Sequence, residues 1–120
     1  MPKNRALKKA GNNYKKKGNI FIKCPQAASS EYFHPIAETR SAKIERIVSH
    51  GQSTPKGVWL RQGFDEWVML LRGRARLVFK PNKKINLKAG DYLFIPRNIF
   101  HRVDWTMPER ATIWLAVHLK

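Results

Sequence analysis

From residue 42 onward the chain consists of short segments of apolar or alternating apolar and polar residues, separated by residues that favour turns. Alternation with a period of two is typical of strands that bury one face, and glycine and proline between the segments favour tight turns. No helical segment of the length needed to connect parallel strands interrupts them, so an antiparallel all-β domain is expected. The predicted strands are 42–49, 57–62, 66–72, 74–80, 83–88, 91–96, 101–106 and 112–119.

The N-terminal segment has a different composition. Residues 1–19 are polar and rich in lysine, with almost no large apolar side chains, so they cannot bury enough surface to offset the entropy of ordering. We expect a disordered basic arm at 1–19 and one folded domain at 20–120. A first edge strand is predicted at 18–23, and a short helical turn between Pro25 and Pro35.

The faces of the predicted strands differ in polarity. The strand at 74–80 alternates and is expected to be half-buried, whereas those at 66–72 and 91–96 are apolar on both faces. Strands that are apolar on both faces need a second layer or another subunit to cover them. We therefore predict a homodimer.

The charge is strongly basic, with 24 Lys and Arg against 8 Asp and Glu. The first 30 residues hold eight of the basic residues and no acidic one, so residues 1–23 form either an arm that attracts nucleic acid or a solvated tail. Without a membrane-spanning apolar run or a secretory signal, a cytoplasmic protein that does not insert in membranes is expected. Cys24 is the only cysteine, which excludes an internal disulfide.

Two sets of regularly spaced residues in the second half of the chain contain the candidate functional residues. Glu66 is followed after six residues by Gly73, and Gly90 is followed after five residues by Pro96 and after four more by His101. These spacings resemble the two sequence motifs of the cupin family, whose members are small β-barrels. The resemblance covers roughly residues 43–119 and implies an antiparallel jelly-roll β-barrel.

The resemblance also implies a candidate metal site. Cupins hold one divalent metal, usually iron, manganese, nickel or zinc, with two histidines and a glutamate of the first motif and a histidine of the second. Glu66 and His101 match, but the two histidine positions of the first motif fall on Leu60 and Gln62. Two further positions of the second motif depart from the pattern, with Asn98 in place of glycine and Trp105 in place of asparagine.

Two interpretations of these residues stay open. Gln62, Glu66 and His101 could hold one divalent metal weakly, because a glutamine carbonyl is a poor substitute for an imidazole. They could instead form a buried hydrogen-bonded network in which Glu66 and His101 act as general acid and base without metal. His118 is assigned a structural role. The barrel lining expected around them consists of Leu60, Val68, Leu70, Val103 and Trp105.

Three classes of function are compatible with this pattern. The barrel could be an enzyme, by analogy a metal-dependent oxygenase or isomerase. It could be a sensing or storage module that binds a small anionic molecule without turnover. It could also act on nucleic acid through residues 1–23. The fold does not choose among them, because cupins carry unrelated chemistries. The sequence lacks a phosphate-binding glycine loop, a serine nucleophile elbow and a HExxH motif.

Overall fold

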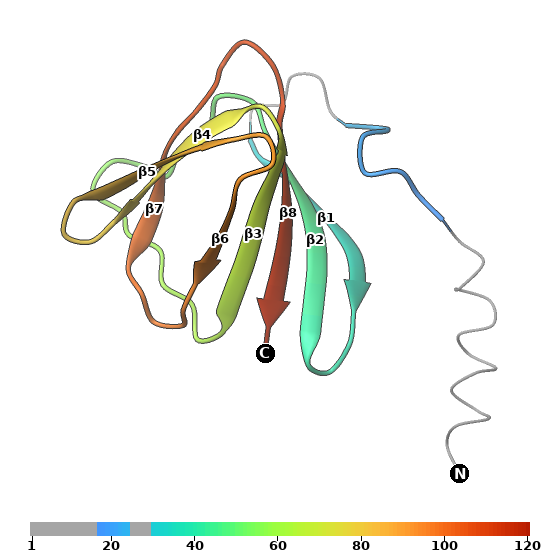
Figure 1. The fold of residues 1–120 in the computed structure, drawn as a ribbon, viewed down its shortest axis with the longest axis horizontal. Helices are drawn as coiled ribbons and strands as arrows, with labels where there is room; N and C mark the ends of the chain where they lie inside the picture. The colour runs from blue at the N-terminus through green and yellow to red at the C-terminus, as the bar shows by residue number, and fades with distance from the viewer. Residues whose placement is uncertain (1–16, 25–29) are drawn as a thin grey trace.

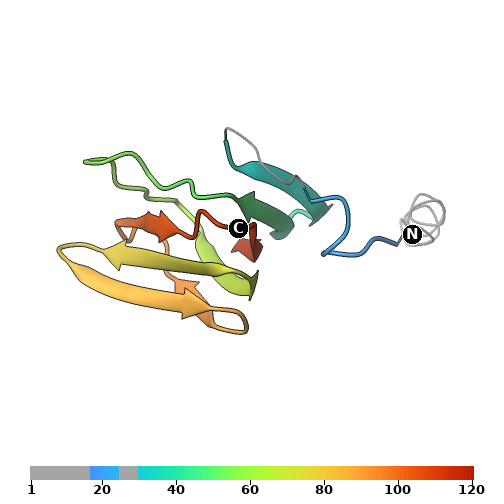
Figure 2. The same cartoon turned by 90° about the horizontal axis from the view of Figure 1, so that it is seen from above.

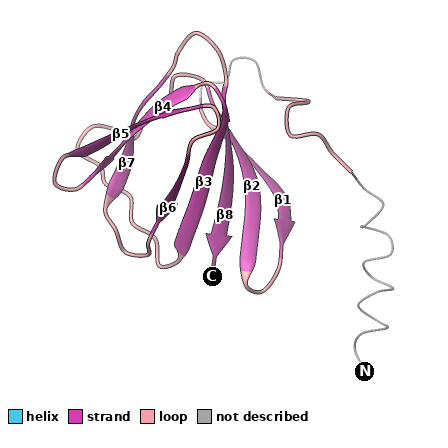
Figure 3. Ribbon diagram, in the orientation of Figure 1, coloured by secondary structure: helices cyan, strands magenta, loops and turns pink. Residues whose placement is uncertain are grey.

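The computed structural model describes residues 17–24 and 30–120, and within these ranges it contains strands and no helix (Figures 1 and 3). The all-β prediction is confirmed. The strands are β1 (Tyr32–Glu38), β2 (Ala42–Ser49), β3 (Asp65–Arg72), β4 (Arg74–Phe79), β5 (Lys83–Lys88), β6 (Tyr92–Ile95), β7 (His101–Thr106) and β8 (Thr112–Leu119).

The strands form two antiparallel sheets that pack face to face. The larger sheet has the order β1-β2-β8-β3-β6 and the smaller one the order β5-β4-β7. Figure 2 shows the two layers from above, with β4 and β5 below the strands of the larger sheet. This double-sheet arrangement is the jelly roll that the sequence predicted.

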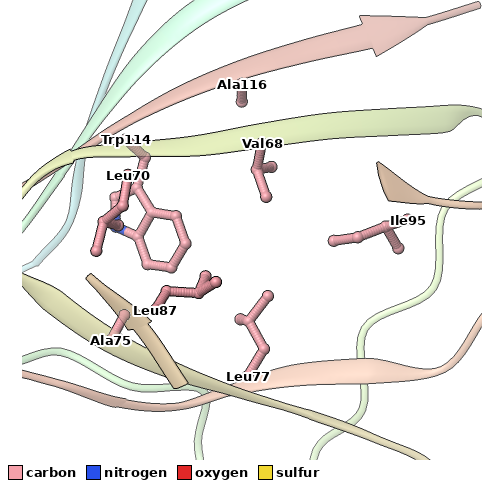
Figure 4. Close-up of a cluster of buried hydrophobic side chains, with 8 residues drawn as sticks. All are labelled: Val68, Leu70, Ala75, Leu77, Leu87, Ile95, Trp114 and Ala116. Atoms are coloured by element: carbon pink, nitrogen blue, oxygen red, sulfur yellow. The ribbon is translucent and has the colours of Figure 1, made fainter. Parts of the chain in front are cut away.

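The core lies between the two sheets. Val68, Leu70 and Trp114 of the larger sheet point toward Leu77 and Leu87 of the smaller one (Figure 4), and all five side chains are buried. Because side chains alternate along a strand, the residues two positions beyond this cluster on β3 and β8 face the same interior. The core therefore determines which polar side chains point into the barrel.

The edge strand predicted at 18–23 is wrong. Residues 20–23 form a turn and bends, which the guanidinium of Arg46 holds by donating hydrogen bonds to the carbonyl oxygens of Ile20 (3.1 Å) and Ile22 (2.7 Å). Arg46 is 3% exposed although it projects from the outer face of β2. This segment is thus attached to the sheet through hydrogen bonds from Arg46 to its backbone, and it is not a strand of the sheet.

The first strand is β1, which the sequence analysis did not predict. All seven of its residues are exposed, so no alternation of buried and exposed positions marks it. Pro35 lies opposite Glu45, and the register shifts between Pro35 and Ala37. Proline is tolerated because β1 is an edge strand, where one side of the backbone needs no partner.

The strand predicted at 57–62 is also wrong. Only Leu60 makes a β-bridge, with His101, through backbone hydrogen bonds of 2.7 and 3.0 Å. Just before it, the N–H of Val58 donates to the carbonyl oxygen of Pro55, which closes a turn. Residues 57–62 are therefore part of the loop between β2 and β3, and Leu60 is the residue of this segment that bridges to β7.

A bulge on β7 changes the predicted lining of the barrel. Arg76 of β4 pairs with Trp105, whereas the next residue, Leu77, pairs with Val103, so Asp104 is the extra residue. Beyond the bulge the alternation is inverted: Thr106 is buried and Trp105 is exposed. The prediction that Trp105 lines the interior is wrong, since it is 39% exposed, and Leu60, which is also 39% exposed, is not part of the buried core.

The predicted basic arm falls mainly outside the described residues, because the structure describes the chain only from residue 17 onward at this end. The domain boundary at residue 20 remains a prediction. Among the described residues, none belongs to a helix with the length and apolar character needed to span a membrane.

Gly73 should be essential for stability. It connects β3 and β4 at φ +90°, and a Cβ there would lie 2.3 Å from the hydroxyl oxygen of Thr112. We expect Gly73→Ala to lower the free energy of unfolding by about 3 kcal/mol, from steric overlap plus the cost of a left-handed residue. Gly90→Ala, at φ +96° with open space, should lose only about 1 kcal/mol. Urea denaturation checks both, and equal losses would contradict the role of Thr112.

Candidate functional site

A row of polar side chains crosses one end of the inner face of the larger sheet. His118 on β8 lies opposite Lys43 on β2 and Glu66 on β3 in the strand register. His118 alternates with the buried residues Trp114 and Ala116, so it faces the interior of the barrel. The antiparallel register thus brings together residues that lie far apart in the sequence.

Glu66 is the centre of this row. It is 7% exposed, and both oxygens of its carboxylate accept hydrogen bonds. Gln62 Nε2 donates to Oε1 at 3.0 Å, and His118 Nε2 lies 3.0 Å from Oε2. A buried carboxylate needs such partners because it has lost its hydration.

His118 connects Glu66 to a second buried carboxylate. Its Nε2 lies 3.6 Å from Glu45 Oε1, and Lys43 Nζ lies 3.7 Å from the other oxygen of Glu45. The ring of Phe64 packs on the imidazole with 4.7 Å between centroids. The Nε2 atom of His118 is therefore close to two carboxylates, and its ring packs against an aromatic ring.

The sequence analysis did not identify His118 as a functional residue. Its alternation with Trp114 and Ala116 was a signal that it points inward, but nothing local revealed that β8 pairs with β3. That pairing joins residues that are far apart in the sequence, such as Glu66 and His118, which are 52 positions apart.

His101 is buried at 3% exposure but has a different partner from the one expected. Its Nδ1 lies 2.9 Å from the carbonyl oxygen of Ile99, and its ring lies 5.9 Å from that of Phe79. Since a carbonyl can only accept, Nδ1 donates its proton in this contact, and Nε2 is the ring nitrogen that points elsewhere. Within the described part of the chain, no hydrogen bond joins His101 to Glu66.

The structure explains why asparagine can replace the glycine of the second family motif at position 98. Asn98 has φ +65°, and its N–H donates to the carbonyl oxygen of Gln62 at 2.7 Å. Asparagine is the residue that best tolerates this left-handed conformation after glycine. Asn98 therefore permits a turn that connects the loop carrying Gln62 to the start of β7.

The four positions of the family's metal site occur as two contacting pairs. Leu60 is bridged to His101, and residues directly opposite in an antiparallel bridge project from the same face. Gln62 is hydrogen-bonded to Glu66. Over residues 17–24 and 30–120, no group of three or more His, Cys, Asp or Glu side chains is arranged to hold a metal ion.

Two exposed carboxyl groups outside this row have lowered pKa values. A hydrogen bond from the Lys120 ammonium lowers the pKa of Glu38, and one from the backbone N–H of Lys88 lowers the pKa of Asp91. They reflect contacts that fasten the C-terminus to β1 and close the β5–β6 turn.

The chain was compared with known proteins. The cupin domain model matches residues 47–118. A structure from Ralstonia eutropha JMP134, called a "putative mannose-6-phosphate isomerase", is 40% identical and superimposes with a TM-score of 0.84 over 88% of this chain and 98% of that one.

Two more distant structures share the fold. A cupin superfamily protein of Desulfitobacterium hafniense DCB-2 is 18% identical, with a TM-score of 0.67 over 80% of this chain and 83% of that one. A protein of unknown function from Streptococcus pyogenes is 16% identical, with a TM-score of 0.69 over 88% of each chain. No curated protein matches the sequence. The family match spans more than half of the 120 residues, and the chain belongs to the cupin family.

Proposed function

We propose that this cupin binds a small phosphorylated sugar at the end of the barrel that holds Glu66, and interconverts its aldose and ketose forms. The observation that carries the proposal is the buried carboxylate of Glu66, held between Gln62 and His118 on the inner face. The name of the 40% identical Ralstonia protein supports this substrate class. The excess of basic over acidic residues favours an anionic ligand.

The proposed reaction needs groups that move protons. In an aldose–ketose isomerisation a base removes the proton from C2 of the sugar and returns it to C1, while a second group moves a proton between the oxygens on these carbons. Glu66 is the proposed base, oriented by Gln62 and His118. His101 is the proposed second group, because its Nε2 has no hydrogen-bond partner among the described residues.

The residues at the family's metal position do not fit a divalent transition metal in this chain. Leu60 has no donor atom, and Gln62 directs its amide nitrogen at Glu66 rather than an oxygen at a central point. Both oxygens of Glu66 are engaged, which leaves one imidazole, His101, as a ready donor. The proposed roles therefore involve no metal.

One observation favours a second candidate function, a module that senses or stores a small anionic ligand without turnover. Each oxygen of Glu66 already accepts a hydrogen bond, so about two of the four lone-pair positions of the carboxylate are occupied before a substrate binds. A carboxylate that is held by such hydrogen bonds can recognise a ligand hydroxyl as well as take part in catalysis.

We also propose that the chain forms a homodimer through the outer face of the larger sheet. Trp67 on β3 pairs with Phe94 on β6, and the Trp67 ring lies 5.9 Å from that of Tyr92. These side chains project away from the core, and Tyr92 and Phe94 are 68% and 50% exposed. Exposed aromatic side chains grouped in this way are typical of a surface that a partner covers.

Turnover should depend on Glu66 and His101. With mannose 6-phosphate as substrate and fructose 6-phosphate as the detected product, we expect Glu66→Gln and His101→Asn each to lower kcat about 100-fold or more, because each removes a proton-transferring group. The control variant Glu109→Gln removes one negative charge from an exposed loop and should leave kcat unchanged.

Calorimetry with the same sugar phosphate separates the two candidate functions. Binding without turnover by the parent protein would establish the ligand-binding module. Neither binding nor turnover with any aldose phosphate would overturn the proposed function. Melting temperatures of the variants show whether a loss reflects misfolding.

Replacing Leu60 and Gln62 by the histidines of the family motif should restore metal binding. We expect the parent protein to hold less than about a tenth of an equivalent of zinc, iron, nickel or manganese, and a Leu60→His/Gln62→His variant to hold roughly one, because a structural metal site needs three or four good donors. Elemental mass spectrometry after loading and dialysis measures both. A near-stoichiometric metal in the parent that is lost in Glu66→Ala/His101→Ala would show that the original residues suffice.

The dimer should depend on the aromatic residues of the outer face. Sedimentation velocity should give twice the chain mass for the parent and the single-chain mass for Tyr92→Lys/Phe94→Lys, since buried charges at an interface core oppose association. Phe33→Lys/Ile36→Lys places the same charges on β1, where exposure is similar, and should leave the dimer intact. If only Phe33→Lys/Ile36→Lys disrupted the dimer, the interface would lie on β1 instead.

A further inference from the structure

Two adjoining hollows lie at the end of the barrel opposite Glu66. Glu66 is the second residue of β3 and Arg72 is its last, so the two mark opposite ends of the sheet (Figure 1). The hollows measure about 470 and 480 Å³ and share Arg72 and Arg110. We call them together the basic trough. Its lining includes Phe21, Lys23, Arg72, Arg74, Lys88 and Arg110.

The positive charge of the basic trough is largely uncompensated. Among the described residues, no acidic one lines either hollow. Arg72, Arg74 and Arg110 form no ion pair with the described residues, and Lys88 makes only an exposed one with Asp91 at 3.4 Å. Clustered cations without counter-charges create a local potential that attracts anions.

An aromatic ring lies within the same surface. Phe21 is 42% exposed, and the guanidinium of Arg72 lies over its ring at 4.5 Å from the centroid. The backbone around Phe21 is fixed, because Arg46 on β2 donates hydrogen bonds to the carbonyls on either side of it. Phe21 is thus a positioned aromatic ring beside several cations.

The sequence that precedes Phe21 is also basic. Lys23 lines the trough, and residues 1–16, which lie outside the described residues, contain six Lys and Arg and no acidic residue. The sequence analysis left open nucleic-acid binding through residues 1–23, whereas the cations on β3, β4, β5 and the loop before β8 belong to the folded domain.

We propose that the basic trough binds single-stranded nucleic acid, with phosphates on Arg72, Arg74 and Arg110 and a base stacked on Phe21. Grooves for single strands combine cations that follow the phosphates with aromatic rings that stack on bases. Two hollows joined through shared arginines form an elongated surface, which suits a chain of phosphates better than one isolated phosphate. This proposal is independent of the site around Glu66.

The test compares two triple variants of the full chain. Fluorescence anisotropy measures binding of a labelled single-stranded RNA of about 12 nucleotides. Arg72→Gln/Arg74→Gln/Arg110→Gln should weaken binding at least tenfold and reduce the slope of log K against log salt by about 2, because three phosphate contacts are lost. Lys56→Gln/Lys83→Gln/Lys84→Gln removes the same charge from other exposed positions and should weaken binding less than about threefold.

The stacking contact is tested by Phe21→Leu, which keeps an apolar side chain but removes the aromatic ring. We expect a loss of about fivefold or more on single-stranded RNA or DNA. Binding of inorganic polyphosphate, which has no bases, should not change. An equal loss on polyphosphate would contradict stacking on Phe21.

Other outcomes would overturn the proposal. Equal affinities of the two triple variants would place binding on the overall charge of the chain rather than on the trough. Binding to phosphatidylserine vesicles without binding to RNA or DNA would assign the surface to a membrane. We expect Arg72→Gln/Arg74→Gln/Arg110→Gln to leave sugar-phosphate turnover unchanged. The two proposals are therefore tested separately, and the failure of this one would not contradict the proposed function.

Discussion

The pairing of β8 between β2 and β3 is the constraint on which the rest of the structure depends. β8 is the central strand of the larger sheet, and its inner face carries Trp114, Ala116 and His118 in succession. The first two complete the apolar core, and the third extends the same face into the polar row. Because side chains alternate with a period of two, the burial of Trp114 and Ala116 directs His118 inward. The register then places Glu66 beside it.

The apolar core separates two polar regions of different composition. At one end of β3, the carboxylates of Glu66 and Glu45 are buried and held by neutral or cationic side chains. At the other end, Arg72 lies among cations with no acidic neighbour lining the trough. Glu66 and Arg72 are six residues apart on β3, which separates them by roughly 20 Å along the strand. The two ends can therefore bind different ligands.

The sequence predicted what depends on local pattern and motif spacing. Alternation and turn residues identified most strands, and the cupin spacing identified Glu66 and His101 as buried residues. Features that depend on long-range register were not predictable in this way. β1 has no buried face, the bulge at Asp104 reverses the alternation of β7, and His118 meets Glu66 only because β8 pairs with β3. Local patterns contain no information on which strands become neighbours.

The replacement of the family's histidines at Leu60 and Gln62 changes how the charge of Glu66 is compensated. A carboxylate taken out of water needs hydrogen-bond donors or a cation nearby. In a metal-binding cupin the ion would supply that charge, whereas here one oxygen accepts the Gln62 amide and the other faces His118, which Glu45 also approaches. With Leu60 on its other side, His101 loses a polar neighbour and is fixed instead by the carbonyl of Ile99. The substitutions thus form a consistent set, in which hydrogen bonds within the protein stabilise the buried carboxylate.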